Sequence, residues 1–127
     1  LNSVPTDRLA SAHQCSARYA DDQSEFEANG FTPWYSETHA APYVAESALR
    51  IGLKLVQKTD IPLNGTMLVI GEVQEVWVAE AALETDGNIR FDELGAAGVG
   101  GLDTYYRFEA AARFPYAKPG VPPVSLI

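Results

Sequence analysis

Three side chains of this sequence could act as soft metal ligands or as a nucleophile: His13, Cys15 and His39. A metal site needs further ligands at a regular spacing, and the sequence offers no third one at such a spacing. A catalytic thiol needs a base within hydrogen-bond reach, whereas positions 13 and 15 point to different sides of a helix. We therefore expect no metal site, and we expect Cys15 to be a buried or half-buried structural residue.

The glycine-rich segment from Gly95 to Gly101 could cradle a phosphate group. A dinucleotide-binding fingerprint needs a preceding strand, a following helix and the order G-x-G-x-x-G. The order is reversed here, and no strand–helix–strand unit is visible. The pattern therefore predicts a flexible connection.

Aromatic side chains form the better candidates for ligand binding. Tyr105, Tyr106 and Arg107 follow the glycine-rich segment, and such residues can stack on or edge a planar heteroaromatic ring. Core packing with a surface arginine explains the same residues equally well. Trp34 and Tyr35 are consistent either with a plug in the core or with a lid over a pocket.

Composition limits the class of protein. The 127 residues match one domain, and 17 acidic against 9 basic residues give a net charge of −8. This charge argues against nucleic acid and anionic membrane surfaces as partners. The apolar runs are too short to span a bilayer. The single cysteine cannot form an internal disulfide, which favours a reducing compartment, the cytoplasm.

The N-terminal part reads as two helices and a loop. Residues 6–17 have helical spacing, with Thr6 as the capping residue. Ser24 and Glu27 form a capping-box pattern before a short helix, which Asn29 and Gly30 would end. Residues 31–42 have no clean period and form a loop.

The pattern then changes to strands. Residues 49–55 alternate, Asn64-Gly65 is a turn dipeptide, and residues 66–78 form a long strand with both faces covered in its first half. We expect an antiparallel pair, with Gly71 at a bulge or a close approach. Weaker signals predict a short strand at Ile89 and Phe91 and a helical turn capped by Asp92. The fold class is thus mainly β with flanking helices.

Several phrases, taken in order, resemble one family. They are Asn2–Pro5, Cys15–Tyr19 with Ser24–Thr32, Ala41–Ser47, Asn64–Val73 and Gly101–Arg107. Together they are similar to the flavin reductase-like, FMN-binding split-barrel family. The resemblance extends from Asn2 to about Pro119, nearly the whole chain.

The resemblance implies a split β-barrel that is incomplete in this chain. Residues 1–119 would be the C-terminal portion of one domain, without the first barrel strands, and residues 120–127 an extended proline-rich tail. Because so few strands leave sheet edges open, we expect a homodimer or a separate N-terminal segment to complete the sheet.

The resemblance also implies an activity: hydride transfer from NADH or NADPH to a flavin, with FMN near the dimer interface. Asn64, Gly65 and Thr66 would lie by the flavin or the nicotinamide. Tyr105 and Arg107 would edge the flavin or reach its phosphate, and Asn2 would contact the ring or hold the end of a strand. Thr66 stands where many relatives carry a histidine, and no residue is a convincing acid, base or nucleophile.

Two other functions stay open. The chain could be a non-catalytic module of the same fold that binds flavin or only dimerises, which the shortage of strands and Thr66 favour. It could also be an acidic β domain that binds another protein through Trp34, Tyr35 and the tail.

Overall fold

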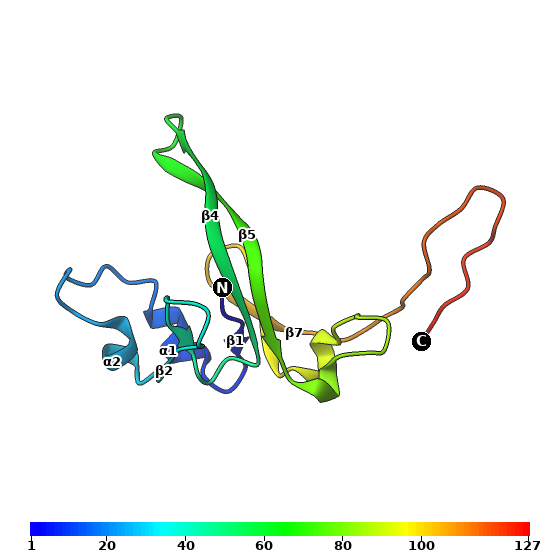
Figure 1. Ribbon diagram of the computed structural model, residues 1–127, viewed down its shortest axis with the longest axis horizontal. Helices are drawn as coiled ribbons and strands as arrows, with labels where there is room; N and C mark the ends of the chain where they lie inside the picture. The colour runs from blue at the N-terminus through cyan, green and yellow to red at the C-terminus, as the bar shows by residue number, and fades with distance from the viewer.

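The computed structural model describes residues 1–127 as three small antiparallel sheets joined by short helices and loops (Figure 1). The prediction of a mainly β fold with flanking helices is confirmed. The helix bounds are α1 Leu9–Gln14, α2 Glu25–Asn29, η1 Glu80–Ala82 and η2 Phe91–Glu93. The strand bounds are β1 Val4–Pro5, β2 Pro33–Trp34, β3 Tyr43–Val44, β4 Leu49–Ile61, β5 Thr66–Val78, β6 Ala96–Gly100 and β7 Thr104–Arg107. No helix has the length and apolar character that crossing a membrane requires.

The β4–β5 hairpin is the longest element, and its pairing agrees with the predicted antiparallel pair. The turn is the predicted one: Gly65 has a φ of 68°, and the Asn64 side chain accepts a hydrogen bond from the Thr66 amide at 3.1 Å. β4 continues to Ile61, beyond the predicted residues 49–55. The register shifts between Leu55 and Gln57, opposite Gly71, which confirms the bulge that was predicted at this glycine.

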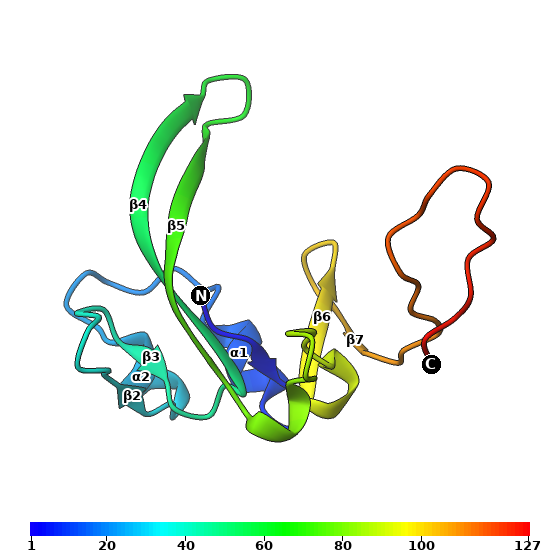
Figure 2. The ribbon, with the colours of Figure 1, turned by 45° about the vertical axis from the view of Figure 1, so that its right-hand side comes forward.

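The far half of this hairpin stands clear of the rest of the chain, as Figures 1 and 2 both show. Four consecutive apolar residues of β5, Met67 to Ile70, are all exposed. Consecutive residues of a strand point to opposite faces. The chain therefore covers neither face here, although the sequence predicted that both are covered.

The prediction of a flexible connection at Gly95–Gly101 is wrong, because most of this segment is strand β6. It pairs with β1 on one side and β7 on the other. Aromatic rings of β7 and its continuation take the place of the missing side chains: a Cβ at Gly100 would meet the Tyr106 ring at 2.7 Å, and one at Gly98 would meet the Phe108 ring at 3.2 Å. Such rings stabilise glycine-containing strands.

The helix predicted over residues 6–17 is shorter, and Arg8 rather than Thr6 stands at its start. The Thr6 amide donates to the Gly95 carbonyl at 2.8 Å, so Thr6 is held in the β1–β6 pairing. The second helix begins after Ser24 and ends at Gly30 as predicted, although Ser24 makes no side-chain capping bond.

The weak signals near residue 90 predicted only part of the structure. Ile89 forms an isolated bridge with Leu83, and Phe91 lies in η2. Asp92 is inside this turn rather than its cap, and it forms an ion pair with Arg90 at 2.7 Å. The ion pair and the turn replace the short strand that was expected.

The buried core is small and lies where the base of the hairpin meets η1 and β6. It consists of Leu49, Ala82, Leu94 and Ala96. The chain exposes 9671 Å² of surface. A compact monomer of 13.7 kDa exposes about 6,600 Å². The excess, roughly 3,000 Å², is the most unusual property of this fold.

We predict that Gly100→Ala lowers the free energy of unfolding by roughly 1–3 kcal/mol, because the new methyl group displaces the Tyr106 ring. Urea unfolding followed by circular dichroism measures this change. Val99→Ala, an exposed position of the same strand, is the matched control and should change stability by only about 0.5 kcal/mol. Equal effects of the two substitutions would contradict the packing of Tyr106 on Gly100.

Candidate functional site

Tyr105 and Arg107 lie two residues apart on β7, so their side chains share one face of the strand. The Tyr105 hydroxyl shares a hydrogen bond of 3.0 Å with Nδ1 of His13, which is in the last turn of α1. The Arg107 guanidinium makes no hydrogen bond and no ion pair within the chain. This face therefore presents a phenol group that His13 orients and a guanidinium group that has no partner within the chain.

Asn64, Gly65 and Thr66 form the turn at the far end of the hairpin. The Thr66 hydroxyl donates to the Asn64 side-chain oxygen at 2.6 Å, and all three residues are exposed. The Asn64 side-chain oxygen thus accepts from both the amide and the hydroxyl of Thr66 within the turn. These three residues are open to solvent at the tip of the hairpin.

Asn2 lies at the other end of the hairpin. It forms a bridge with Arg50 near the start of β4, and its side-chain oxygen accepts a hydrogen bond from the Val44 amide at 3.0 Å. Asn2 thus holds the N-terminal segment against the β2–β3 sheet. The resemblance implies that Asn2 either contacts the flavin ring or holds the end of a strand, and this contact fits the second role.

The chain does not bring the predicted residues into one place. The strand from Arg50 to Ile61 spans about 35 Å at the usual rise per residue. Asn2 and the Asn64–Thr66 turn are therefore at opposite ends of a long ribbon. Figure 1 also shows the tip of the hairpin far from β7, so the turn and the Tyr105–Arg107 face of one chain are separate sites.

Sequence reasoning missed a polar cluster centred on Glu75 of β5. Its carboxylate accepts hydrogen bonds from the Ser36 hydroxyl at 2.6 Å, the Tyr43 hydroxyl at 2.7 Å and the Thr38 hydroxyl. Ser36 and Thr38 lie in the segment 31–42 that was predicted as a loop, and Tyr43 follows it in β3. The prediction of a loop was wrong for Pro33–Trp34, which form strand β2 by pairing with β3. The cluster fastens this loop to the base of the hairpin.

Charge-state preferences in the cluster follow from these bonds. The hydroxyl of Ser36, followed by those of Thr38 and Tyr43, lowers the pKa of Glu75 to about 2. Burial, and then the hydrogen bond to Glu75, raises the pKa of Tyr43 to about 12. An ionised carboxylate and a neutral phenol are thus held over a wide pH range. Such a pair is suited to positioning a loop and poorly suited to proton transfer near neutral pH.

Aromatic packing surrounds this cluster. The Trp34 ring lies 5.6 Å from that of Tyr43 and 5.0 Å from that of Trp77, and the Arg50 guanidinium sits 5.2 Å from the Trp34 ring centre. Trp34 is half-buried in this packing, which favours the plug of the two alternatives for this residue, whereas Tyr35 is exposed. Gly52 leaves the space for the Tyr43 hydroxyl, because any Cβ there would collide with it.

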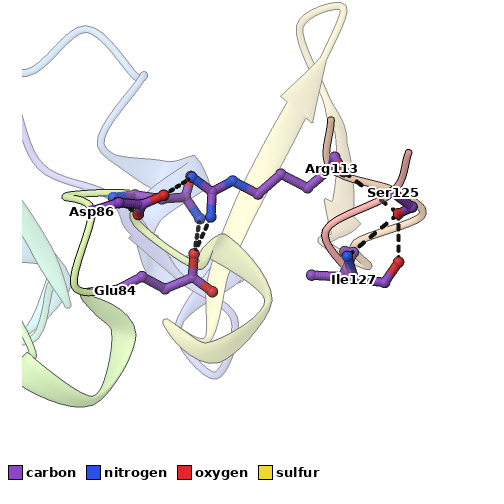
Figure 3. Close-up of polar contacts among 6 residues, drawn as sticks. Glu84, Asp86, Arg113, Ser125 and Ile127 are labelled. Atoms are coloured by element: carbon purple, nitrogen blue, oxygen red, sulfur yellow. Dashed lines mark hydrogen bonds and ion pairs between the residues drawn. The ribbon is translucent and has the colours of Figure 1, made fainter. Parts of the chain in front are cut away.

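A second cluster fastens the C-terminal segment, and Figure 3 shows it. The Arg113 guanidinium forms ion pairs with the carboxylates of Glu84, at 2.5 Å, and Asp86. The hydrogen bond from Arg113 lowers the pKa of Asp86. The Leu126 amide donates to the Arg113 carbonyl at 2.7 Å, so residues 114–125 form a loop closed at its base.

The remaining chemical candidates show no catalytic arrangement. Burial raises the pKa of the Cys15 thiol, and its sulfur donates to the Ser11 carbonyl at 3.4 Å. A thiol in this state is a poor nucleophile. His13 contacts Tyr105, and His39 packs on Tyr43, so the two imidazoles belong to different clusters.

We predict a pH dependence centred on Glu75. Because its pKa is lowered from 4.5 to about 2, its bonds stabilise the fold fully above about 4.5 and are lost as the pH falls toward 2. Unfolding by urea, followed through tryptophan fluorescence, should show a smaller loss of stability over this range in Glu75→Gln than in the unsubstituted chain. Glu109→Gln, at an exposed carboxylate without a hydrogen bond, should follow the unsubstituted chain. Parallel curves for all three proteins would exclude the Glu75 cluster as the source.

Residues 1–95 match the model of the flavin reductase like domain. A proposed flavin reductase with a split barrel domain from Shewanella frigidimarina is 45% identical, with a TM-score of 0.86 over 91% of this chain and 59% of that chain. No curated protein sequence matches.

Two further solved structures share the fold at lower identity. The flavoredoxin of Desulfovibrio vulgaris is 24% identical, with a TM-score of 0.69 over 94% of this chain and 61% of that chain. The 2-nitrobenzoate 2-nitroreductase of Pseudomonas fluorescens is 22% identical, with a TM-score of 0.75 over 96% of this chain and 60% of that chain. This chain therefore spans about three-fifths of the length of the structures that it matches. The chain belongs to the flavin reductase-like family, and its fold is an incomplete split β-barrel.

Proposed function

We propose that this chain is part of an FMN-dependent oxidoreductase that passes hydride from NADH or NADPH to a flavin. The match of residues 1–95 to the flavin reductase like domain carries this proposal. When bound, FMN supplies the ring that accepts the hydride. The free thiol of Cys15 is consistent with a reducing compartment, and we place the protein in the cytoplasm.

The residues on β7 fit the chemistry of FMN. An arginine without an internal partner is suited to a phosphate, which it binds through two parallel hydrogen bonds. Arg107 has no partner although the chain carries a net charge of −8. Tyr105 is half-buried, and its ring can edge the flavin while its hydroxyl is held by His13. These two residues would orient the cofactor and would not transfer a proton.

We further propose that the site forms at the interface of a homodimer. The excess exposed surface of roughly 3,000 Å² per chain is enough for a permanent interface, in which each partner buries about 1,000–2,500 Å². Many of the exposed apolar side chains on this surface belong to the hairpin. A second copy could place its Asn64–Thr66 turn beside Tyr105 and Arg107, which a single chain cannot do. A separate N-terminal segment of the same protein is the other candidate to cover this surface.

The alternative is a non-catalytic flavin-binding or dimerisation module. Thr66 favours it, because a threonine hydroxyl can donate a hydrogen bond but cannot carry the charge of an imidazolium. The absorbance of the nicotinamide separates the two functions. A chain that binds FMN but does not accelerate NADH or NADPH oxidation is the module, whereas one that does is the reductase.

We predict that Arg107→Gln weakens FMN binding by about tenfold or more, because a charge-assisted contact to the phosphate is lost. Fluorescence titration with FMN and with riboflavin, which lacks the phosphate, measures both affinities. The riboflavin affinity should not change. Arg18→Gln is the matched control, since Arg18 is also exposed and without an ion pair. A loss of equal size for both ligands would place Arg107 away from the phosphate.

We predict complementation between copies. Arg107→Gln and a double substitution of the turn, Asn64→Ala with Thr66→Ala, should each be defective in FMN binding. Unfolding and refolding the two variants together should restore part of the binding, since a mixed dimer contains one intact site. Two sites that each lie within one chain would give no recovery on mixing.

A further inference from the structure

The proposed function uses the contact between His13 and Tyr105 only as a support and assigns His13 itself no role at the site. It is the one side-chain hydrogen bond that joins α1 to β7, and it links residues 92 positions apart. The rings meet edge to face, with centres 5.9 Å apart and an interplanar angle of 82°. Both the ring and the hydroxyl of Tyr105 are therefore oriented by a single side chain.

The two faces of β7 have different roles. Tyr106 lies on Gly100 of the neighbouring strand, and the Phe108 ring lies on Gly98, so this face is occupied by internal packing. Tyr105 and Arg107 lie on the opposite face. On that face, the hydrogen bond to His13 is the only one that the Tyr105 side chain makes. The position of Tyr105 beside the unpaired Arg107 therefore depends on His13.

The chemistry of this bond determines what Tyr105 can offer a ligand. A phenol has one proton to donate. If Nδ1 of His13 accepts that proton in a hydrogen bond, the phenol can only accept from a ligand. If Nδ1 carries a proton, it donates to the phenol oxygen, and the phenol proton is free to bond to a ligand. The tautomer of the His13 imidazole thus determines whether the Tyr105 hydroxyl donates to His13 or to a ligand.

We propose that His13 is a positioning residue of the flavin site, which fixes the ring of Tyr105 and the direction in which its hydroxyl donates. This inference rests on the proposed function, because it takes Tyr105 to contact the flavin. His13 acts only through Tyr105 and does not touch the cofactor.

A double-mutant cycle with FMN binding as the readout tests the inference. His13→Phe keeps an aromatic edge against Tyr105 but removes the hydrogen bond, whereas His13→Gln keeps a polar partner. We expect His13→Phe to raise the FMN dissociation constant by roughly three- to tenfold and His13→Gln to recover part of the loss. In a Tyr105→Phe background, His13→Phe should have no further effect. His39→Phe, the other histidine, is the matched control and should leave binding unchanged.

The outcomes separate the inference from the proposed function. An unsubstituted chain that binds no FMN would overturn both. Normal FMN binding with no change in His13→Phe would overturn the inference alone. An equal loss in the presence and absence of the Tyr105 hydroxyl would also overturn it, because a structural role of His13 in α1 acts in both backgrounds. The absorbance bands of the bound flavin give a second readout, since they shift with a changed hydrogen bond to the ring but not with reduced stability.

Discussion

The β4–β5 hairpin is held together by its backbone ladder and cross-strand side-chain pairs, and almost nothing else in the chain touches its far half. Water is a poor solvent for the apolar side chains on its two faces. A two-stranded ribbon is marginally stable by itself. The hairpin is therefore the least supported element of the chain, and in the homodimer that we propose a second copy covers it and completes the site.

The hydrophobic core is small, and polar contacts between distant segments add to the stability of the fold. Glu75 collects three hydroxyl groups and fastens the aromatic loop to the base of the hairpin. Arg113 joins the C-terminal segment to the Glu84–Asp86 loop. His13 fastens α1 to β7. Each cluster joins segments that are distant in the sequence, so together they do much of what a continuous core does in a compact domain. Of these contacts, the one from His13 reaches the face of β7 that holds Tyr105 and Arg107.

The hairpin was predictable because its signals are local. Alternation, β-branched residues and the Asn64-Gly65 turn specify both strands without help from the rest of the chain. The β6 strand was not predictable, because its glycines are stabilised by rings that follow in the sequence, on β7 and just beyond it. The Glu75 cluster was missed for the same reason: its donors and acceptor lie in separate segments, and a carboxylate between Gln74 and Val76 resembles an ordinary exposed position of a strand. The phrases that resemble the flavin reductase-like family identified the fold, whereas the distribution of the six site residues over the N-terminal segment, the tip of the hairpin and β7 became visible only in the structure.

The most direct test of the shared site is native mass spectrometry of the purified chain with FMN, which counts the polypeptides and the flavins in one particle. We expect particles of two chains that retain FMN. A chain that is instead monomeric and free of FMN at saturating flavin would contradict the account, because two copies of this chain would then form neither the covered hairpin nor the interface site.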